Sequence, residues 1–183
     1  LDLLISQTKR CGEILKKILQ KKIINNKFIS AIKFEDLLVE ILRSFTETSE
    51  KSITIKSDND SNKINIKRTP EIIYGLRNFI GNAVKFSENK IQVVLESSNE
   101  TITIKINDDG SGFPEDIIHL LGEPYIKSRS REIANKSGLG LGTFLGKTLL
   151  ERQGAKLSFS NKNEYGGASV KICWAIKDLI YNS

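Results

Sequence analysis

Residues 69–87 read TPEIIYGLRNFIGNAVKFS and predict the central helix of the fold. Thr69 supplies a capping hydroxyl, Pro70 suits the first helical position and Glu71 places an acid in the first turn. A helix therefore begins here, and it runs to about Ser87. Its apolar stripe recurs at helical spacing through Ile72, Ile73, Leu76, Ile80, Ala83 and Val84.

A second stripe of the same helix carries polar side chains. Asn78, Asn82 and Lys85 lie at positions i, i+4 and i+7, so they share one face. Two amides and a lysine suit a phosphate-bound magnesium ion, because an Asn oxygen is a hard ligand and Mg²⁺ takes few protein ligands. From this helix alone, a solvated polar face is the simpler interpretation.

Two glycine-rich segments follow. DDGSGFP, residues 108–114, comes directly after an alternating run, so Asp108 would end a strand and Gly110 and Gly112 would allow a sharp bend close to a ligand. An ionised Asp108 could accept from an exocyclic amine and so select adenine over guanine. Taken alone, the segment also fits a surface turn.

The second such segment, GLGLG at 138–142, opens another predicted helix. Free amides at a helix start make a phosphate cradle. A lone glycine triplet is weak evidence for a phosphate site. Two other glycine-rich phosphate-binding motifs are nevertheless disfavoured. No strand directly precedes the triplet, as in a dinucleotide-binding turn, and no Gly-Lys-Ser/Thr follows it, as in a P-loop.

The remaining pattern predicts the fold class. Helices are expected at 34–46 and about 139–153, the latter capped by Gly154. Alternating runs at 53–55 and 64–66, at 91–95 and 102–106, and at 157–159 and 170–174 are each expected to form a hairpin. Strands and helices do not alternate one for one. We therefore expect a two-layer α/β sandwich, with a mixed or antiparallel sheet of about five or more strands and helices on one face.

Residues 1–24 predict a further helix. Its apolar positions recur at alternating spacings of four and three, through Leu4, Thr8, Cys11, Leu15 and Ile18. Such a seam is typical of a coiled coil or helix bundle, although packing on the chain's own domain is the alternative. We expect a linker at 25–33, the main domain at 34–176 and a tail at 177–183.

The composition of the chain disfavours several classes of function. The formal charge of +6 comes with only 7% aromatic residues and scattered lysines, which disfavours nucleic-acid binding. Two distant cysteines and the single His119 disfavour a disulfide scaffold or a zinc site. No apolar run is long enough to cross a bilayer, so we expect membrane attachment only through segments absent from this chain.

In order and spacing, RNFIGNAVKFS, DDGSGFP and GLGLGTFLGKTLLERQGAKLSFSN resemble the Asn box and two glycine boxes of one ATPase fold. That fold is shared by histidine kinases, gyrase, the Hsp90 chaperones and MutL, and the resemblance covers residues 34–174. It implies that ATP and Mg²⁺ bind, with Asn82 and Asn78 holding the metal and Lys85 approaching the phosphates. It also places Phe86 near the base or ribose and Asp108 at the adenine amino group. The remaining implied ATP-binding residues are Gly110, Gly112, Gly138, Leu139, Gly140, Leu141, Gly142 and Thr143. Residues 119–138 become an ATP lid, in which Lys127 and Arg129 would reach the terminal phosphates.

A narrower likeness involves LLISQTKRCGEIL, LGEPYIKSR and GGASVKICW, which resemble the RegB/PrrB branch of sensor histidine kinases. That branch is redox-responsive and pairs with RegA/PrrA-type response regulators. The resemblance implies that residues 1–24 are the second helix of a dimerisation and phosphotransfer hairpin, and that Cys11 is redox-active. It also implies a homodimer, and a cytoplasmic domain in a full-length protein anchored in the inner membrane.

One departure from this pattern concerns the phosphoacceptor histidine, which belongs on the first hairpin helix and is absent here. We interpret His119 as a helix-end or lid residue and Cys173 as a buried small apolar group. Two alternatives remain: an anti-sigma-factor type of serine kinase, and a binding module without catalysis. The bundle-type helix at 1–24 disfavours the first, and the intact Asn82, Asp108 and glycine triplets disfavour the second.

Overall fold

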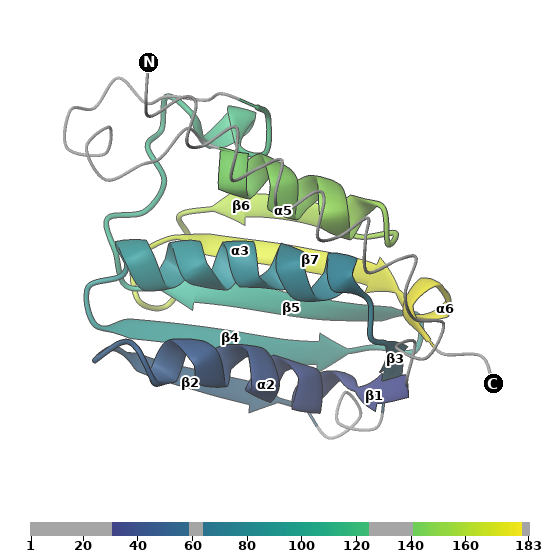
Figure 1. The fold of residues 1–183 in the computed structure, drawn as a ribbon. Helices are drawn as coiled ribbons and strands as arrows, with labels where there is room; N and C mark the ends of the chain where they lie inside the picture. The colour runs from purple at the N-terminus through teal and green to yellow at the C-terminus, as the bar shows by residue number, and fades with distance from the viewer. Residues whose placement is uncertain (1–30, 59–63, 125–140, 181–183) are drawn as a thin grey trace, which may run out of the picture. The chain divides into compact units, whose positions relative to one another are not determined.

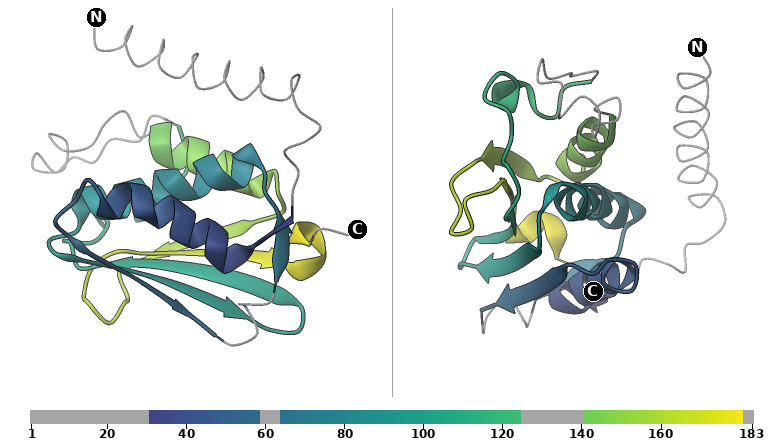
Figure 2. Two further views of the ribbon diagram at one scale, coloured as in Figure 1. Left: turned by 60° about the horizontal axis from the view of Figure 1, so that its bottom comes forward. Right: turned by 90° about the vertical axis from the view of Figure 1, so that its left-hand side faces the viewer.

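Figure 1 shows the fold in a computed structural model, which describes residues 31–58, 64–124 and 141–180. Three helices, α2 (Phe34–Thr46), α3 (Pro70–Phe86) and α5 (Leu141–Glu151), cover one face of a five-stranded sheet. The strand order is β2-β4-β5-β7-β6. The bounds are β2 (Ser52–Ser57), β4 (Lys90–Ser97), β5 (Thr101–Asp108), β6 (Lys156–Ser160) and β7 (Ser169–Ala175). The predicted two-layer sandwich is confirmed, and Figure 2 shows its layers from two sides.

The sheet is mixed, which corrects one predicted hairpin. The strand at 52–57 does not pair with the next strand in sequence, β3 (Asn65–Lys67), but runs parallel to β4, with Ser52 opposite Lys90. β3 instead pairs antiparallel with β1 (Ala31–Lys33) in a separate two-stranded sheet. A parallel pair needs a long crossover, and the segment containing α3 supplies it. The other two predicted hairpins, β4–β5 and β6–β7, are confirmed.

α3 lies between α2 and α5 on the sheet (Figure 1). Its start matches the sequence prediction, because the Thr69 hydroxyl accepts a hydrogen bond from the Ile72 amide at 3.3 Å. At its other end, Lys51 Nζ donates to the main-chain oxygens of Val84 and Ser87, each at 2.6 Å. A cation at a helix C-terminus satisfies free carbonyls and complements the helix dipole. Both ends of α3 are therefore fixed.

The core lies between the sheet and the helices. Alternate strand residues are fully buried there, among them Val93, Ile104 and Ile172. α2 contributes Leu37, Leu38 and Ile41, and α3 contributes Leu76 and Ile80. Phe34 meets Trp174 edge to face, with ring centroids 5.8 Å apart. This packing holds the apolar stripe of α3 against the sheet. The polar stripe with Asn78, Asn82 and Lys85 therefore lies away from the core.

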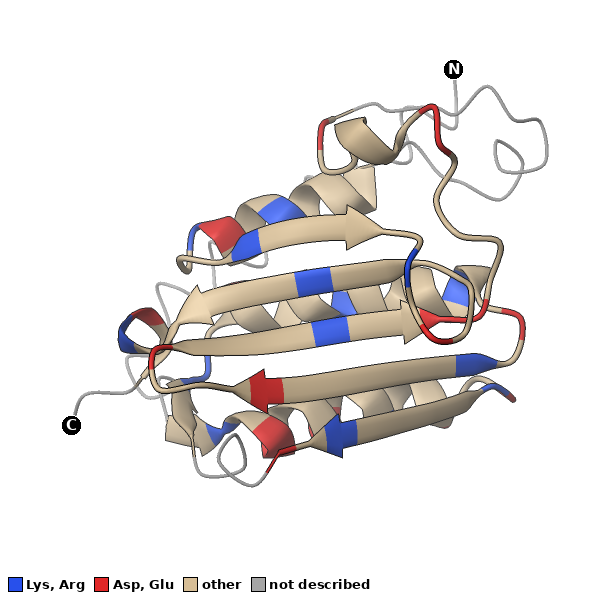
Figure 3. Cartoon of the chain, turned by 180° about the vertical axis from the view of Figure 1, so that it is seen from behind, with Lys and Arg blue, Asp and Glu red and all other residues tan. Residues whose placement is uncertain are grey.

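The other face of the sheet carries no described helix, and its lysines and acids are visible in Figure 3. Cys173 lies on this side, half-buried, opposite Thr103 of β5 and Lys156 of β6. The prediction that Cys173 is a buried small apolar group is therefore wrong, because its side chain is only half-buried. Neighbouring residues of a strand face opposite ways, so the burial of Trp174 in the core turns Cys173 outward.

The folded unit extends slightly beyond the predicted limits. Residues 31–33, in the predicted linker, form β1, and the compact unit begins at Ala31. In the predicted tail, α6 (Ile176–Leu179) buries Leu179, and Ile180 forms a bridge with Ile66. The predicted helix at 1–24, with Cys11, lies outside the described residues. None of the helices in the described ranges is long and apolar enough to span a membrane.

Candidate nucleotide-binding site

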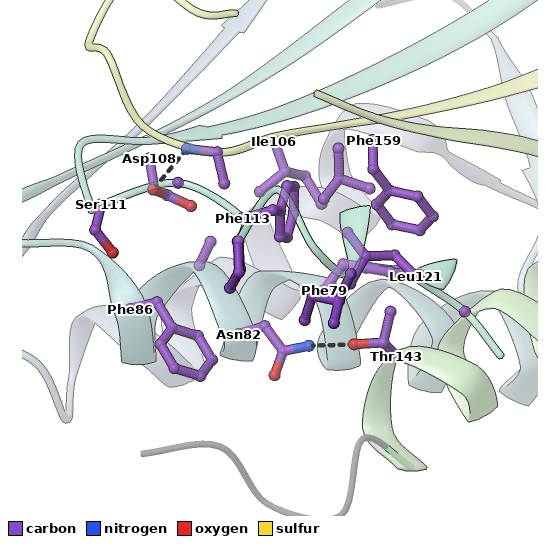
Figure 4. Close-up of a pocket in the computed structure, with 17 residues that line it drawn as sticks. Phe79, Asn82, Phe86, Ile106, Asp108, Ser111, Phe113, Leu121, Thr143 and Phe159 are labelled. Atoms are coloured by element: carbon purple, nitrogen blue, oxygen red, sulfur yellow. Dashed lines mark hydrogen bonds between the residues drawn. The ribbon is translucent and has the colours of Figure 1, made fainter. Parts of the chain in front are cut away.

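A pocket opens between α3, the segment that follows β5, and the start of α5 (Figure 4). Polar side chains line one part of it: Asn82, Asp108, Ser111 and Thr143. Apolar side chains line the rest: Phe79, Ala83, Phe86, Ile106, Phe113, Pro114, Ile117, Leu121, Phe159 and Val170. A largely apolar cavity with a few convergent polar groups is the usual form of a small-molecule site.

Asp108 is the charged residue of this pocket. It ends β5, is only 5% exposed, and points into the cavity (Figure 4). Its Oδ1 accepts from the main-chain amides of Gly110, at 2.9 Å, and Ala168, at 3.1 Å. Among the described residues nothing donates to Oδ2. Burial raises the pKa of Asp108 above its ordinary value, and the two amide donors oppose that rise. One carboxylate oxygen is thus held by the fold and the other is available to a ligand.

The two positions after Asp108 that hold glycine each require it, for different structural reasons. A Cβ atom at Gly110 would lie 2.3 Å from the main-chain oxygen of Phe86, so only glycine lets this segment pass the end of α3. Gly112 has a φ of +78°, and a Cβ there would lie 2.8 Å from Asn161 Oδ1. The close approach at Gly110 and the positive φ at Gly112 agree with the bend expected from the sequence, and its closeness to a ligand stays a prediction.

The polar stripe of α3 meets the start of α5. Asn82 Nδ2 donates to the Thr143 hydroxyl at 3.2 Å, which leaves the Asn82 amide oxygen as an acceptor (Figure 4). Asn78 Nδ2 donates to the main-chain oxygen of Tyr74, and its Oδ1 lies 3.4 Å from where a Cβ of Gly142 would be. The Asn82 amide nitrogen and the Asn78 amide oxygen therefore face the segment that begins α5, while the Asn82 oxygen points away from Thr143.

Lys85 and Phe86 follow on the same helix. Lys85 Nζ lies 5.2 Å from the centroid of the Phe86 ring, and Phe86 is 36% exposed at the pocket. Of the predicted ATP-binding residues, Asn82, Phe86, Asp108, Gly112 and Thr143 line the pocket. Asn78, Lys85, Gly110, Leu141 and Gly142 lie on the same segments without lining it. Gly138, Leu139, Gly140, Lys127 and Arg129 lie outside the described residues.

The donor types fit a magnesium ion carried by phosphates. The described residues hold no group of three or more His, Cys, Asp or Glu side chains able to bind a metal. Neutral amide oxygens such as that of Asn82 suit Mg²⁺ that keeps waters and phosphate oxygens as its other ligands.

Sequence reasoning missed the contributions of Phe159 in β6 and of Asn161 in the β6–β7 connection. The Asn161 side chain clamps the main chain of Phe113, accepting from its amide at 2.7 Å and donating to its carbonyl at 2.8 Å. Phe159 packs against Phe79 and Phe113, with ring centroids 6.0 and 5.8 Å apart. In the sequence, an Asn between two strands is an ordinary turn residue, so nothing local identifies its partner.

Comparisons with a protein family, with curated proteins and with solved structures all bear on this site. The family model described as histidine kinase-, DNA gyrase B- and HSP90-like ATPase matches residues 67–177, more than half of the chain. Sensor histidine kinase RegB of Cereibacter sphaeroides is 40% identical over 130 residues, which cover 63% of this chain and 28% of RegB. Sensor histidine kinase YkoH of Bacillus subtilis is 27% identical over 151 residues, 79% of this chain and 31% of YkoH. The chain thus spans less than a third of the length of these curated relatives.

Solved structures agree on the fold. The catalytic domain of histidine kinase ThkA, in a nucleotide-free form, superposes with a TM-score of 0.67 over 82% of this chain and 98% of that one. The two sequences are 16% identical, so this likeness concerns the fold alone. The match over residues 67–177 shows that the chain belongs to the family of histidine kinase-, DNA gyrase B- and HSP90-like ATPases.

Proposed function

We propose that this chain is the ATP-binding catalytic part of a two-component sensor histidine kinase. In the reaction, the γ-phosphoryl group of ATP passes to a histidine on a dimerisation helix. The observation that carries the proposal is the meeting of Asp108 Oδ2 and the Asn82 amide in one largely apolar pocket. An adenine-selective acceptor and a neutral oxygen ligand are the two groups that a magnesium nucleotide needs at its opposite ends.

Different residues contact the base, the metal ion and the phosphates of the nucleotide. Asp108 Oδ2 accepts from the 6-amino group of adenine, while Phe86 and Ile106 contact the base through apolar surface. Asn82 Oδ1, supported by Asn78, faces the metal, and Lys85 approaches the phosphates. Bound Mg²⁺ neutralises charge that develops on the phosphate oxygens during phosphoryl transfer. The glycine segment that ends at Gly142, with Lys127 and Arg129 of the lid, binds the phosphates.

The wider assignment rests on similarity rather than on the pocket. The 40% identity to sensor histidine kinase RegB supports a sensor histidine kinase. From the resemblance of the sequence to the RegB/PrrB branch, we propose that the kinase is redox-responsive and pairs with a RegA/PrrA-type response regulator. Within this proposal, residues 1–24 form the second helix of the dimerisation hairpin and bring two chains together. Cys11 would report oxidation, and the full-length protein would be anchored in the inner membrane.

A labelling experiment tests the catalytic assignment. The chain holds a single histidine, His119, and we expect no autophosphorylation when it is incubated alone with γ-labelled ATP. The acceptor must lie in line with the γ-phosphate, and no hairpin histidine is present to do so. Adding an inactive full-length homologue with an intact acceptor should restore label that is lost in acid and kept in base.

Two results of that experiment would contradict the proposal. Acid-labile label on His119 in the chain alone would give that residue a role as acceptor. Label that is stable in acid would indicate a serine or threonine kinase of the same fold. Asn82→Ala is the matched control, because it should abolish transfer while leaving the acceptor untouched.

A further inference from the structure

The loop between β6 and β7, residues 161–168, reads NKNEYGGA and turns back beside the end of β5. The Asn163 side chain makes three hydrogen bonds, two within the loop and one to the end of β5. Its Nδ2 donates to the main-chain oxygens of Asp108, at 3.0 Å, and Ala168, at 2.7 Å. Its Oδ1 accepts from the Tyr165 amide at 2.7 Å. One side chain therefore ties the loop to the residue that faces the ligand.

Asp108 and Ala168 are in turn bonded to each other twice. The Asp108 amide donates to the Ala168 carbonyl at 3.0 Å, and the Ala168 amide donates to Asp108 Oδ1 at 3.1 Å. The pair continues the β5–β7 ladder one step past its last partners, Asn107 and Ser169. Asn163 bonds to the carbonyls of both members, so it fixes the pair from which the Asp108 carboxylate takes its orientation.

The two glycines of the loop occupy different surroundings. Gly167 is buried, and a Cβ atom there would lie 2.4 Å from the Asp108 carbonyl oxygen and 2.6 Å from Asp108 Oδ1. Gly166 has a φ of +83°, but a Cβ there would meet nothing within 4 Å. Gly167 therefore allows the loop to touch Asp108, whereas Gly166 only allows the loop to turn.

A second anchor holds the loop on the open face of the sheet. The Tyr165 hydroxyl accepts from Gln92 Nε2 at 2.7 Å, and Gln92 of β4 is only 4% exposed. The loop is thus fixed to β4 through Tyr165 and to the end of β5 through Asn163. A loop held at two points can fix a carboxylate more precisely than a free turn, since its own geometry is not adjustable.

We propose that Asn163 is a positioning residue for adenine recognition: it holds the Asp108–Ala168 pair so that Oδ2 of Asp108 faces the 6-amino group of the base. The inference rests on the base contact proposed for Asp108. It places part of the base selectivity of the pocket in a hairpin loop that lies more than fifty residues away in sequence.

Titration calorimetry of the 183-residue chain with two nucleotides tests this inference. One nucleotide is ATP, and the other is purine riboside triphosphate, in which hydrogen replaces the 6-amino group. The wild type should prefer ATP. Asn163→Ala should reduce that preference by about three- to tenfold, the effect of weakening one hydrogen bond, and should leave the affinity for the analogue within about twofold. Lys162→Ala, at the exposed neighbouring position, is the control that should keep the wild-type preference.

The adjacent glycines give an independent pair of variants. Gly167→Ala should lower the preference for ATP by displacing Asp108, whereas Gly166→Ala should keep it, even though the positive φ lowers its thermal stability. If Gly167→Ala does not fold, Asn163→Ala decides alone.

Two outcomes would overturn the inference. Equal loss of both nucleotides in Asn163→Ala, or an unchanged preference, would reduce Asn163 to a structural role. A wild type that binds both nucleotides equally would remove the Asp108 base contact itself, and the inference with it. Because the wild type is measured separately, the two failures are distinguishable.

Discussion

Replacing Asp108 by asparagine changes one atom of a pocket-lining side chain and keeps the shape of that side chain. The amides of Gly110 and Ala168 both donate to Oδ1, so the asparagine must place its oxygen there and its NH₂ group at the position of Oδ2. The group that faces the base then becomes a donor. A hydrogen bond to a charged acceptor contributes about 1.5–3 kcal/mol, and 1.4 kcal/mol is a factor of ten. We expect the Kd for ATP to rise about ten- to a hundredfold.

The same substitution should not destabilise the empty protein. Burial raises the pKa of Asp108 in the folded state, so the folded chain binds a proton more tightly than the unfolded chain. The stability that Asp108 contributes is then fully present below its unfolded pKa and is lost as the pH rises through its folded pKa. At pH 7 the ionised carboxylate therefore lowers the free energy of unfolding. Asp108→Asn, which resembles the neutral form, should melt at the same temperature or higher.

Calorimetry with ATP, GTP and purine riboside triphosphate, combined with thermal unfolding without nucleotide, measures both effects. The expected result is a large loss of ATP affinity and little change for the analogue. GTP should gain relative to ATP, because its 6-oxo group can accept from the new NH₂ group. An Asp108→Asn variant that binds ATP within about twofold of the wild type would refute the role of Oδ2. A clear drop in melting temperature would refute the electrostatic reasoning.

Three further predictions come from the structure, and a fourth comes from the sequence resemblance that concerns Cys11. The preference for ATP over purine riboside triphosphate should fall on acidification through the raised pKa of Asp108, as the proton occupies Oδ2. Protonation of the triphosphate affects both nucleotides alike, so parallel titrations across pH 4–8 measure the preference. Asn82→Ala should bind ATP in the presence of Mg²⁺ about as weakly as the wild type does in chelator, and a retained Mg²⁺ enhancement would contradict the assigned metal contact. Gly110→Ala should lower the free energy of unfolding by roughly 1–3 kcal/mol, because the added Cβ clashes with the end of α3. Gly81→Ala, inside α3 with ordinary contacts to Phe45, should raise the free energy of unfolding by about 0.5–1 kcal/mol. Urea denaturation of the two variants and the wild type measures both changes. Mild oxidation should yield a covalent dimer on a non-reducing gel that Cys11→Ser abolishes, and a dimer that persists in Cys11→Ser would exclude this cysteine as the link.

Local chemistry determined the elements of this protein. The cap at Thr69, the proline after it and the apolar stripe place α3 within a residue of its observed bounds, because these signals act inside a single helix. Alternation likewise predicted β4, β5 and β7. The three boxes that carry Asn82, Asp108 and Gly142 were recognisable because each is a short contiguous segment. Their order and spacing along the chain also match the pattern of the ATPase fold.

Only the tertiary structure decided which strands pair and which distant side chains support the site. β2 and β3 both alternate, but whether they pair with each other depends on the crossover through α3 and on where their apolar faces find cover. Asn163 is an ordinary loop residue until the β5–β7 ladder brings it beside Asp108. Helix caps and strand alternation depend on neighbours a few residues apart, whereas strand partners and buried polar networks are set by the packing of the whole sheet.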